Sequence, residues 1–98
     1  AAVPKADVII TNPTHFSVAL RYDRKRDVAP TVVAKGVDEV AMHIREIAKE
    51  HGVPLMEDPP LARALFRTVK VGQTVPEKFY HAVAAVLSHV YRMKGRTA

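Results

Sequence analysis

Two segments that favour β-strands stand almost back to back near the start of the chain. Asp7–Thr11 is a short run rich in β-branched residues, and it ends at Asn12-Pro13. Ser17–Tyr22 alternates, with its apolar residues on one side. Because only Asn12–Phe16 separate the two segments, we expect two neighbouring strands joined by a tight turn.

The middle of the chain continues with alternating strand-like and helical segments. Thr31–Lys35, closed by Gly36, and Val53–Glu57 favour two more short strands. Between them, the residues from Val37 to His51 show the 3.6-residue spacing of an amphipathic helix, and Gly52 is placed as its stop. The apolar stripe of this helix consists of Val37, Val40, Ala41, Ile44, Ile47 and Ala48.

Capping residues predict where two later helices begin. Asp58 suits the N-cap, and Pro59 the first position, of a helix over about Pro60–Val69. Thr74-Val75-Pro76-Glu77 fits a capping box for a last helix over about Val75–Met93. That helix has either one wide buried face or a buried face beside a docking face, because apolar residues line two adjoining sides: Phe79, Val83, Val86 and Val90, and Tyr80, Ala84, Leu87 and Tyr91.

Together these segments predict an α/β fold, with a small central sheet of about four short strands surrounded by helices. The 98 residues suit one domain with a modest core. The longest apolar run, Ala82–Leu87, is too short to span a bilayer. Cysteine is absent, which excludes disulfides and thiol nucleophiles. Since Ala1–Asp7 lacks the apolar stretch of a secretory signal, we expect the cytosol or a surface facing it.

The formal charge of +5 makes acidic partners conceivable. Basic residues gather in two clusters. The first is interrupted by acidic residues and has no recognition-helix motif, so it favours a solvated loop over a nucleic-acid site. The clusters are Arg21, Arg24, Lys25 and Arg26, and then Arg92, Lys94 and Arg96.

A metal or phosphate cofactor is not expected. His43, Glu46 and Glu50 have the spacing of helical metal ligands, but that spacing is also routine on a solvated helix face. The glycines are isolated, so no phosphate-binding loop is present in the sequence.

Asn12-Pro13-Thr14-His15 is the segment that carries distinctive chemistry. Pro13 has no backbone N–H, so the usual deamidation route at asparagine is closed. The side-chain nitrogen of Asn12 could instead attack its own backbone carbonyl, form a succinimide and break the Asn12–Pro13 bond. A tight turn would hold these atoms together, His15 could serve as a base and Thr14 could hydrogen-bond the turn. The competing interpretation is that Asn-Pro only starts a turn.

The wider pattern resembles the cytoplasmic domain of the bacterial type III export switch proteins, the self-cleaving gate components of flagella and injectisomes. The Asn-Pro-Thr-His tetrad and the Pro-Leu-Ala-Arg-Ala-Leu run are its most specific parts, and the details are more similar to the flagellar branch. The resemblance covers nearly the whole chain: Lys5–Tyr22, Ala29–Gly36, Ile44–Ala48, Val53-Pro54, Pro59–Phe66, Val75-Pro76 and Tyr80–Ala84.

This resemblance implies that residues 1–98 form one cytoplasmic domain of a larger membrane protein, at the cytoplasmic face of the inner membrane, nicked between Asn12 and Pro13. Asn12 would be the nucleophile and Pro13 would supply the leaving nitrogen, while Thr14 and His15 would support the turn. The two pieces would stay associated and help to switch export from rod and hook subunits to filament-type subunits. The implied partners are other gate proteins, the export ATPase complex, rod and hook substrates and the hook-length ruler.

The resemblance also implies a hydrophobic docking patch for early export substrates at Ala29, Pro30, Ala84 and Leu87. From the residues alone, Ala84 and Leu87 share a helix face, and Leu87 by itself is better explained by core packing. The sequence leaves open a binding module whose turn never breaks, and a basic nucleic-acid-binding domain. A peptidase acting on other chains would lack a nucleophile that can be regenerated. We therefore expect one round of self-cleavage rather than an enzyme with turnover.

Overall fold

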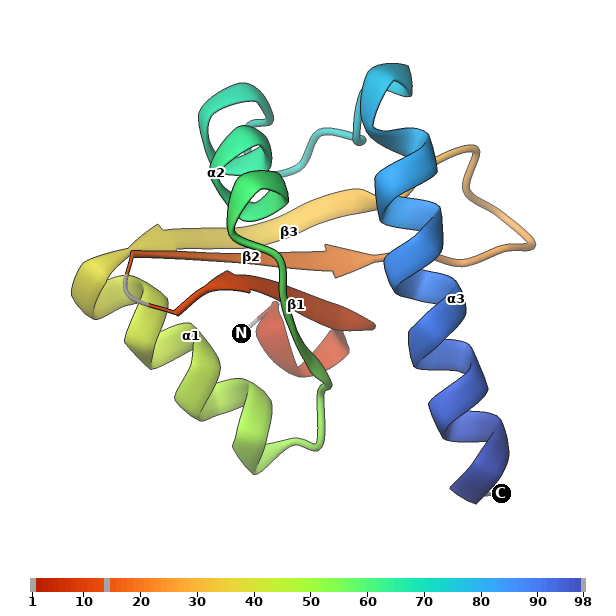
Figure 1. The fold of residues 1–98 in the computed structure, drawn as a ribbon, viewed down its shortest axis with the longest axis horizontal. Helices are drawn as coiled ribbons and strands as arrows, with labels where there is room; N and C mark the ends of the chain where they lie inside the picture. The colour runs from red at the N-terminus through yellow and green to blue at the C-terminus, as the bar shows by residue number, and fades with distance from the viewer. Residues whose placement is uncertain (1, 14, 98) are drawn as a thin grey trace.

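The computed structural model describes residues 2–13 and 15–97, with side chains described as far as Lys94. Four strands form one sheet in the order β3-β2-β1-β4 (Figure 1). They are β1 (Val8–Asn12), β2 (Phe16–Arg21), β3 (Thr31–Val37) and β4 (Leu55–Glu57). β2 is antiparallel to both β1 and β3, and β4 is parallel to β1. The expected α/β fold with about four short strands is confirmed.

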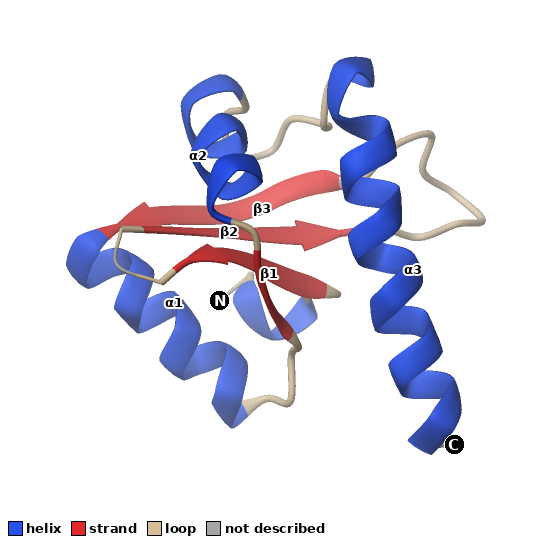
Figure 2. Ribbon diagram, in the orientation of Figure 1, coloured by secondary structure: helices blue, strands red, loops and turns tan. Residues whose placement is uncertain are grey.

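Helices cover both faces of this sheet (Figure 2). α1 (Asp38–Glu50) and the short 3₁₀ helix η1 (Val3–Lys5) lie on one face, and α2 (Pro59–Thr68) and α3 (Tyr80–Thr97) lie on the other. A second short 3₁₀ helix, η2 (Glu77–Phe79), precedes α3. Of the described helices, none is both long enough and apolar enough to cross a membrane.

β1 is an inner strand that is buried on both faces. Val8 and Ile10 point into the larger core under α2 and α3, and Ile9 points into the smaller core under α1. All three side chains have no exposed surface. This matches the prediction for the β-branched run, because a strand covered on both faces needs apolar residues at successive positions.

The structure corrects the expected end of the third strand. Gly36 does not close it but lies within β3 opposite Ser17, and Val37 pairs with Phe16. A Cβ atom at Gly36 would lie 2.4 Å from Cγ1 of Val40. Glycine is therefore required there by the close approach of α1 to the strand, not by a turn.

The apolar stripe expected for α1 is only partly buried. Ala41, Ile44 and Ala48 face the core, whereas Val37 and Val40 are exposed by 40% and 55%. Gly52 ends the helix region with a positive φ of 70°, as its position predicted.

The two predicted N-caps have different outcomes. Asp58 caps α2 as expected, and its Oδ1 accepts the backbone N–H of Leu61 at 3.3 Å. The prediction of a capping box at Thr74 is wrong, because the backbone of Thr74 forms an isolated β-bridge with Thr31 instead of beginning a helix. The last helix therefore begins at Tyr80, after η2, and not at Val75.

Candidate functional site

The Asn-Pro motif lies where β1 turns into β2. Asn12 is the last residue of β1, is buried and pairs with Phe16 across the ladder. The backbone N–H of His15 donates a hydrogen bond to the carbonyl oxygen of Asn12 at 3.0 Å, which closes the expected tight turn. Pro13 is exposed at the tip. Thr14, which the sequence also placed in the site, lies outside the described residues.

Backbone hydrogen bonds tie this turn to the elements around it. The carbonyl of His15 accepts the N–H of Asp38 at 2.8 Å, at the junction of β3 and α1. The carbonyl of Thr11 accepts the N–H of Asp58 at 2.9 Å, just before α2. Both sides of the Asn12–Pro13 bond are therefore held by contacts that come from distant parts of the chain.

His15 is the one ionisable side chain of the predicted tetrad, and it lies at the surface. Its Nδ1 atom is 3.6 Å from Oδ1 of Asp38. Its ring centroid is 6.1 Å from that of Phe16, which in turn lies 4.9 Å from Phe66 on α2. The ring thus has an apolar neighbour on one side and a carboxylate near one nitrogen.

The hydrogen bond in this turn polarises the Asn12 carbonyl. A hydrogen bond from the His15 N–H withdraws charge from the carbonyl oxygen, and it would strengthen as that oxygen becomes negative in a tetrahedral intermediate. Pro13 closes the competing deamidation route because it has no N–H. The arrangement therefore combines a polarised carbonyl with the only intramolecular nucleophile that the Asn-Pro sequence leaves.

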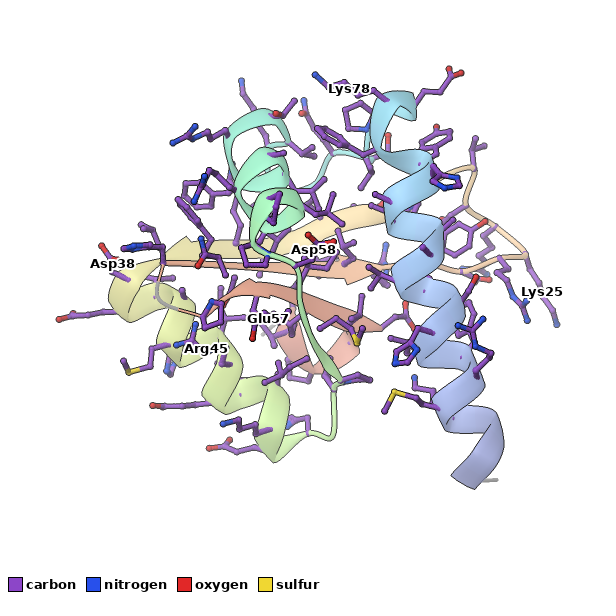
Figure 3. All side chains as sticks on the ribbon, in the orientation of Figure 1. Lys25, Asp38, Arg45, Glu57, Asp58 and Lys78 are labelled. Atoms are coloured by element: carbon purple, nitrogen blue, oxygen red, sulfur yellow. The ribbon has the colours of Figure 1, made fainter. Side chains whose placement is uncertain are left out.

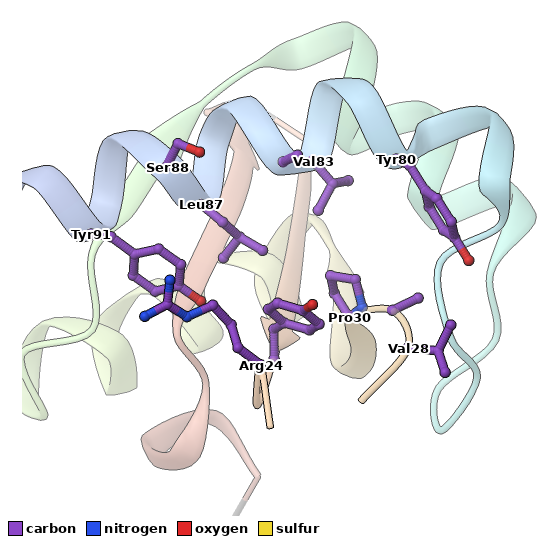
Figure 4. Close-up of a pocket in the computed structure, with 11 residues that line it drawn as sticks. Arg24, Val28, Pro30, Tyr80, Val83, Leu87, Ser88 and Tyr91 are labelled. Atoms are coloured by element: carbon purple, nitrogen blue, oxygen red, sulfur yellow. The ribbon is translucent and has the colours of Figure 1, made fainter. Parts of the chain in front are cut away.

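A separate pocket of about 310 Å³ lies at the other end of β2 (Figure 4). It contains all four residues of the predicted docking patch, so the structure brings Ala29, Pro30, Ala84 and Leu87 together. The buried residues of its lining are Ala29, Pro30, Val83 and Leu87, and the exposed ones include Arg24, Val28, Tyr80, Ala84 and Ser88.

Leu87 is a core residue that also contributes to the lining of the pocket. It is only 4% exposed and belongs to the larger core, as its packing interpretation predicted, and it also lines the pocket. Ala84 is exposed, so a substitution there would change the pocket without opening the core.

Arg24 and Tyr91 form a polar wall beside this apolar lining. The guanidinium carbon of Arg24 lies 5.1 Å from the centre of the Tyr91 ring. Burial raises the pKa of Tyr91 above its ordinary value, and the Asp7 carboxylate raises it further, while Arg24 opposes the shift. Tyr91 is therefore a neutral hydrogen-bonding group at physiological pH.

Several residues near the two sites were missed by sequence reasoning. Asp38 was not placed at the Asn-Pro turn, and Tyr22, Val28 and Tyr80 were not placed around a pocket. Nothing in the local sequence marks these residues, because each reaches its site through strand pairing or helix packing. Arg24 was assigned to a solvated cluster, and its cation–π contact with Tyr91 is visible only in three dimensions.

The other candidate groups stay apart. His43, Glu46 and Glu50 are all exposed, and among the described residues no three histidine, cysteine, aspartate or glutamate side chains converge as metal ligands. Arg24, Lys25 and Arg26 are exposed on the loop after β2, in agreement with a solvated loop, whereas Arg21 is the exposed last residue of β2. The side chain of Arg96 lies outside the described part of the chain.

Comparison with known proteins places this geometry in a family. Residues 1–90 match the model of the FlhB HrpN YscU SpaS family. The flagellar biosynthetic protein FlhB of Salmonella typhimurium is 59% identical over 92 residues, and that of Bacillus subtilis is 56% identical over 92 residues. These matches cover 94% of this chain but only 24% and 26% of the relatives, so the chain spans about a quarter of their length.

Solved structures agree with the sequence matches. The cytoplasmic domain of FlhB from Shewanella putrefaciens superposes with a TM-score of 0.92 at 48% identity, covering 98% of this chain and 74% of that one. A mutated EscU C-terminal domain superposes with a TM-score of 0.87 at 33% identity, covering 90% of this chain and 88% of that one.

The EscU structures include substitutions of an asparagine, of the proline that directly follows it and of a histidine two residues after the proline. These residue types have the same spacing as Asn12, Pro13 and His15 in this chain. By sequence and by fold, the chain belongs to the FlhB HrpN YscU SpaS family.

Proposed function

We propose that this chain is the self-cleaving cytoplasmic domain of a flagellar type III export protein and that it acts as a specificity switch and docking module. The observation that carries the proposal is the turn at Asn12-Pro13, in which the Asn12 carbonyl accepts the His15 N–H. The flagellar names of the relatives and the cytoplasmic domain among the structural neighbours support the setting.

The proposed cleavage needs no reactant other than the chain itself. The Nδ2 atom of Asn12 forms a bond to the backbone carbon of Asn12, and the bond from that carbon to the Pro13 nitrogen breaks. A proton leaves Nδ2, with His15 as the base, and a proton is delivered to the Pro13 nitrogen. The products are a 12-residue piece ending in a succinimide and an 86-residue piece beginning with a free proline amine. The step happens once, because the nucleophile is consumed.

The fold explains why the two pieces would remain together. The 12-residue piece contains all of β1, which is hydrogen-bonded to β2 on one side and to β4 on the other. Val8, Ile9 and Ile10 are fully buried, and each contributes about 1.5–3 kcal/mol of hydrophobic stabilisation relative to exposure. Cleavage at the turn removes a covalent link but no part of this packing.

The pocket supplies a surface for docking. It is lined mainly by apolar residues and opens to solvent beside exposed Val28 and Tyr80, so it suits an apolar side chain of an extended export substrate. We expect rod and hook subunits and the hook-length ruler as ligands, and other gate proteins and the export ATPase complex as further contacts of the full-length protein at the inner membrane.

Intact mass measured under denaturing conditions tests the cleavage. Freshly purified, unboiled protein should give two masses that meet between Asn12 and Pro13, and Asn12→Ala should give one full-length mass. Before the succinimide hydrolyses, the two masses should sum to the uncleaved mass without an added water. A single full-length mass from the wild-type chain after days at mildly alkaline pH would leave a binding module whose turn does not break.

Pro13→Ala tests the role of the missing N–H. This variant should cleave more slowly and should instead deamidate, with a mass gain of about one dalton. Alanine restores the backbone N–H at position 13, and a nitrogen that carries this hydrogen can attack the side-chain carbonyl of Asn12. Cleavage at the wild-type rate would show that blocking this N–H is irrelevant.

Ala84→Asp tests docking in the pocket. A buried apolar ligand group would then face a charge, so binding of export substrates should weaken by at least about tenfold in a calorimetric titration. Ala85→Asp is the matched control, because Ala85 is an exposed neighbour that does not line the pocket. Equal affinity of the two variants would remove the pocket as the docking site, and steeply salt-dependent binding to DNA or RNA would support the nucleic-acid alternative.

A further inference from the structure

Asp38 is unusual in both its backbone and its position. With a φ of 50°, it is the one described residue other than glycine that has a positive φ. This left-handed conformation is sterically unfavourable for most side chains, although aspartate and asparagine tolerate it better than others. Such residues often mark functional sites, and Asp38 lies at the β3–α1 junction, at the same end of the sheet as the β1–β2 turn (Figure 3).

Two atoms of Asp38 contact the same residue of the cleavage turn. Its backbone N–H donates to the carbonyl of His15 at 2.8 Å, and its Oδ1 lies 3.6 Å from Nδ1 of His15. The second distance is slightly longer than a hydrogen bond, and a small rotation of either exposed side chain would close it. Asp38 therefore anchors His15 through the main chain and faces its ring with a carboxylate.

The surrounding residues keep Asp38 in this place. Val37, directly before it, pairs with Phe16, directly after His15. The hydroxyl of Ser17 donates to the carbonyl of Ala41 at 3.0 Å and binds the first turns of α1 to β2. The distance between Asp38 and His15 is thus set by the sheet register and by helix docking, even though both side chains are exposed.

A carboxylate beside Nδ1 of a histidine has a known chemical effect. It favours the tautomer with the proton on Nδ1, fixes the ring orientation and leaves Nε2 with a lone pair that can accept a proton. The side chains of His15 and Asp38 are 58% and 68% exposed, so their contact adds little to stability and its effect is on orientation.

We propose that Asp38 is a positioning residue for Asn12–Pro13 cleavage: its carboxylate holds His15 with Nδ1 protonated, so that Nε2 accepts the proton released by the Asn12 side chain. This inference rests on the proposed self-cleavage and adds to it a residue outside the Asn-Pro-Thr-His tetrad. The proton moves from Nδ2 of Asn12 to Nε2 of His15 as the succinimide bond forms, and it is then available to the departing Pro13 nitrogen.

The rate of cleavage gives the first test. Asp38→Asn removes the charge and keeps a side chain that tolerates the left-handed backbone, and Asp38→Gly removes the carboxylate without backbone strain. Both variants should cleave at least about tenfold more slowly than wild type. This loss is smaller than the full contribution of a general base, because His15 itself is still present. Glu39→Gln is the matched control, because Glu39 is an exposed acid in the same helical turn, and it should cleave at the wild-type rate.

The tautomer of His15 gives a second test that does not depend on cleavage. In the uncleavable Asn12→Ala chain, long-range ¹H–¹⁵N NMR spectra at a pH where the ring is neutral should show the proton on Nδ1. Adding Asp38→Asn should move the population toward the Nε2-protonated tautomer, while adding Glu39→Gln should not. A purely structural role of Asp38 would leave the tautomer unchanged.

The outcomes separate the two proposals. If the wild-type chain cleaves but Asp38→Asn and Asp38→Gly cleave as fast as Glu39→Gln, the positioning role is overturned and self-cleavage stands. Slower cleavage with an unchanged tautomer also overturns it, because Asp38 would then act on the turn and not through His15. If the wild-type chain never cleaves, self-cleavage itself fails and this inference fails with it.

Discussion

If the chain cleaves as we propose, replacing Ile10 with alanine should weaken the binding of the 12-residue N-terminal piece to the rest of the domain. Ile10 is fully buried in β1, opposite Val18 on β2 and Met56 on β4. It belongs to the larger core, where α2 and α3 cover it. After cleavage, β1 is attached only by non-covalent contacts, so any lost packing appears directly as lost affinity between the two pieces.

The size of the effect follows from the burial. Truncating a fully buried isoleucine to alanine costs about 2–5 kcal/mol, because both the transfer free energy and the contacts around the new cavity are lost. Since about 1.4 kcal/mol corresponds to a tenfold change in a dissociation constant, the 12-residue piece should bind about 30-fold to several thousand-fold more weakly. Val71→Ala is the control, because Val71 is 56% exposed and lies outside both cores.

Native mass spectrometry measures this directly. Cleaved protein is mixed with an isotopically heavy copy of the 12-residue piece, and replacement of the light piece is followed with time. Wild type and Val71→Ala should exchange slowly, and Ile10→Ala should exchange faster by roughly its loss of affinity, because affinity differences of this kind lie mostly in the dissociation rate. Equal exchange by Ile10→Ala and Val71→Ala would refute the idea that β1 burial holds the pieces together.

Substitutions at three further positions test local features of the structure. Gly36→Ala should destabilise the chain by about 1–3 kcal/mol in thermal denaturation, because its Cβ would overlap Val40 and force α1 away from β3; an unchanged melting temperature would contradict this close approach. Asp58→Ala should cost about 1 kcal/mol in urea denaturation through loss of the α2 cap, whereas Asp58→Asn should cost less. The raised pKa of Tyr91 means that the folded chain holds this proton more tightly than the unfolded chain, so stability is full below a pH of about 10 and falls as pH rises toward the folded pKa. Tyr91→Phe should remove this part of the alkaline loss, and identical pH–stability curves for the two chains would show that burial does not perturb the group.

Local sequence was sufficient for the parts of the fold that short-range physics controls. The β-branched run of β1 and the alternation of β2 predicted two paired strands, and Asp58-Pro59 predicted the start of α2. These features depend on residues within a few positions of one another, where strand preference, side-chain capping and the fixed φ of proline act directly.

Sequence reasoning failed where a competing long-range contact decided the outcome. Thr74 has the chemistry of a helix cap but is drawn into a β-bridge with Thr31, so the last helix starts later. Gly36 predicted the end of a strand, but β3 continues through this residue, which pairs with Ser17 on β2. Neither partner is near in sequence, so no local pattern could reveal the contact.

The candidate site divides in the same way. The sequence by itself identified Asn12–Pro13 as the bond for which we propose cleavage, because only an asparagine followed by proline combines an internal nucleophile with a blocked deamidation route. The tertiary structure decided which residues meet around that bond and which meet at the separate pocket. Asp38 reaches His15 through the register of β2 and β3, and the residues of the pocket come together where α3 packs on the other end of the sheet. The physical reason is the sequence separation of the interacting residues. The chemistry available to a peptide bond depends on the two residues that it joins, whereas its surroundings depend on which distant segments pack against each other.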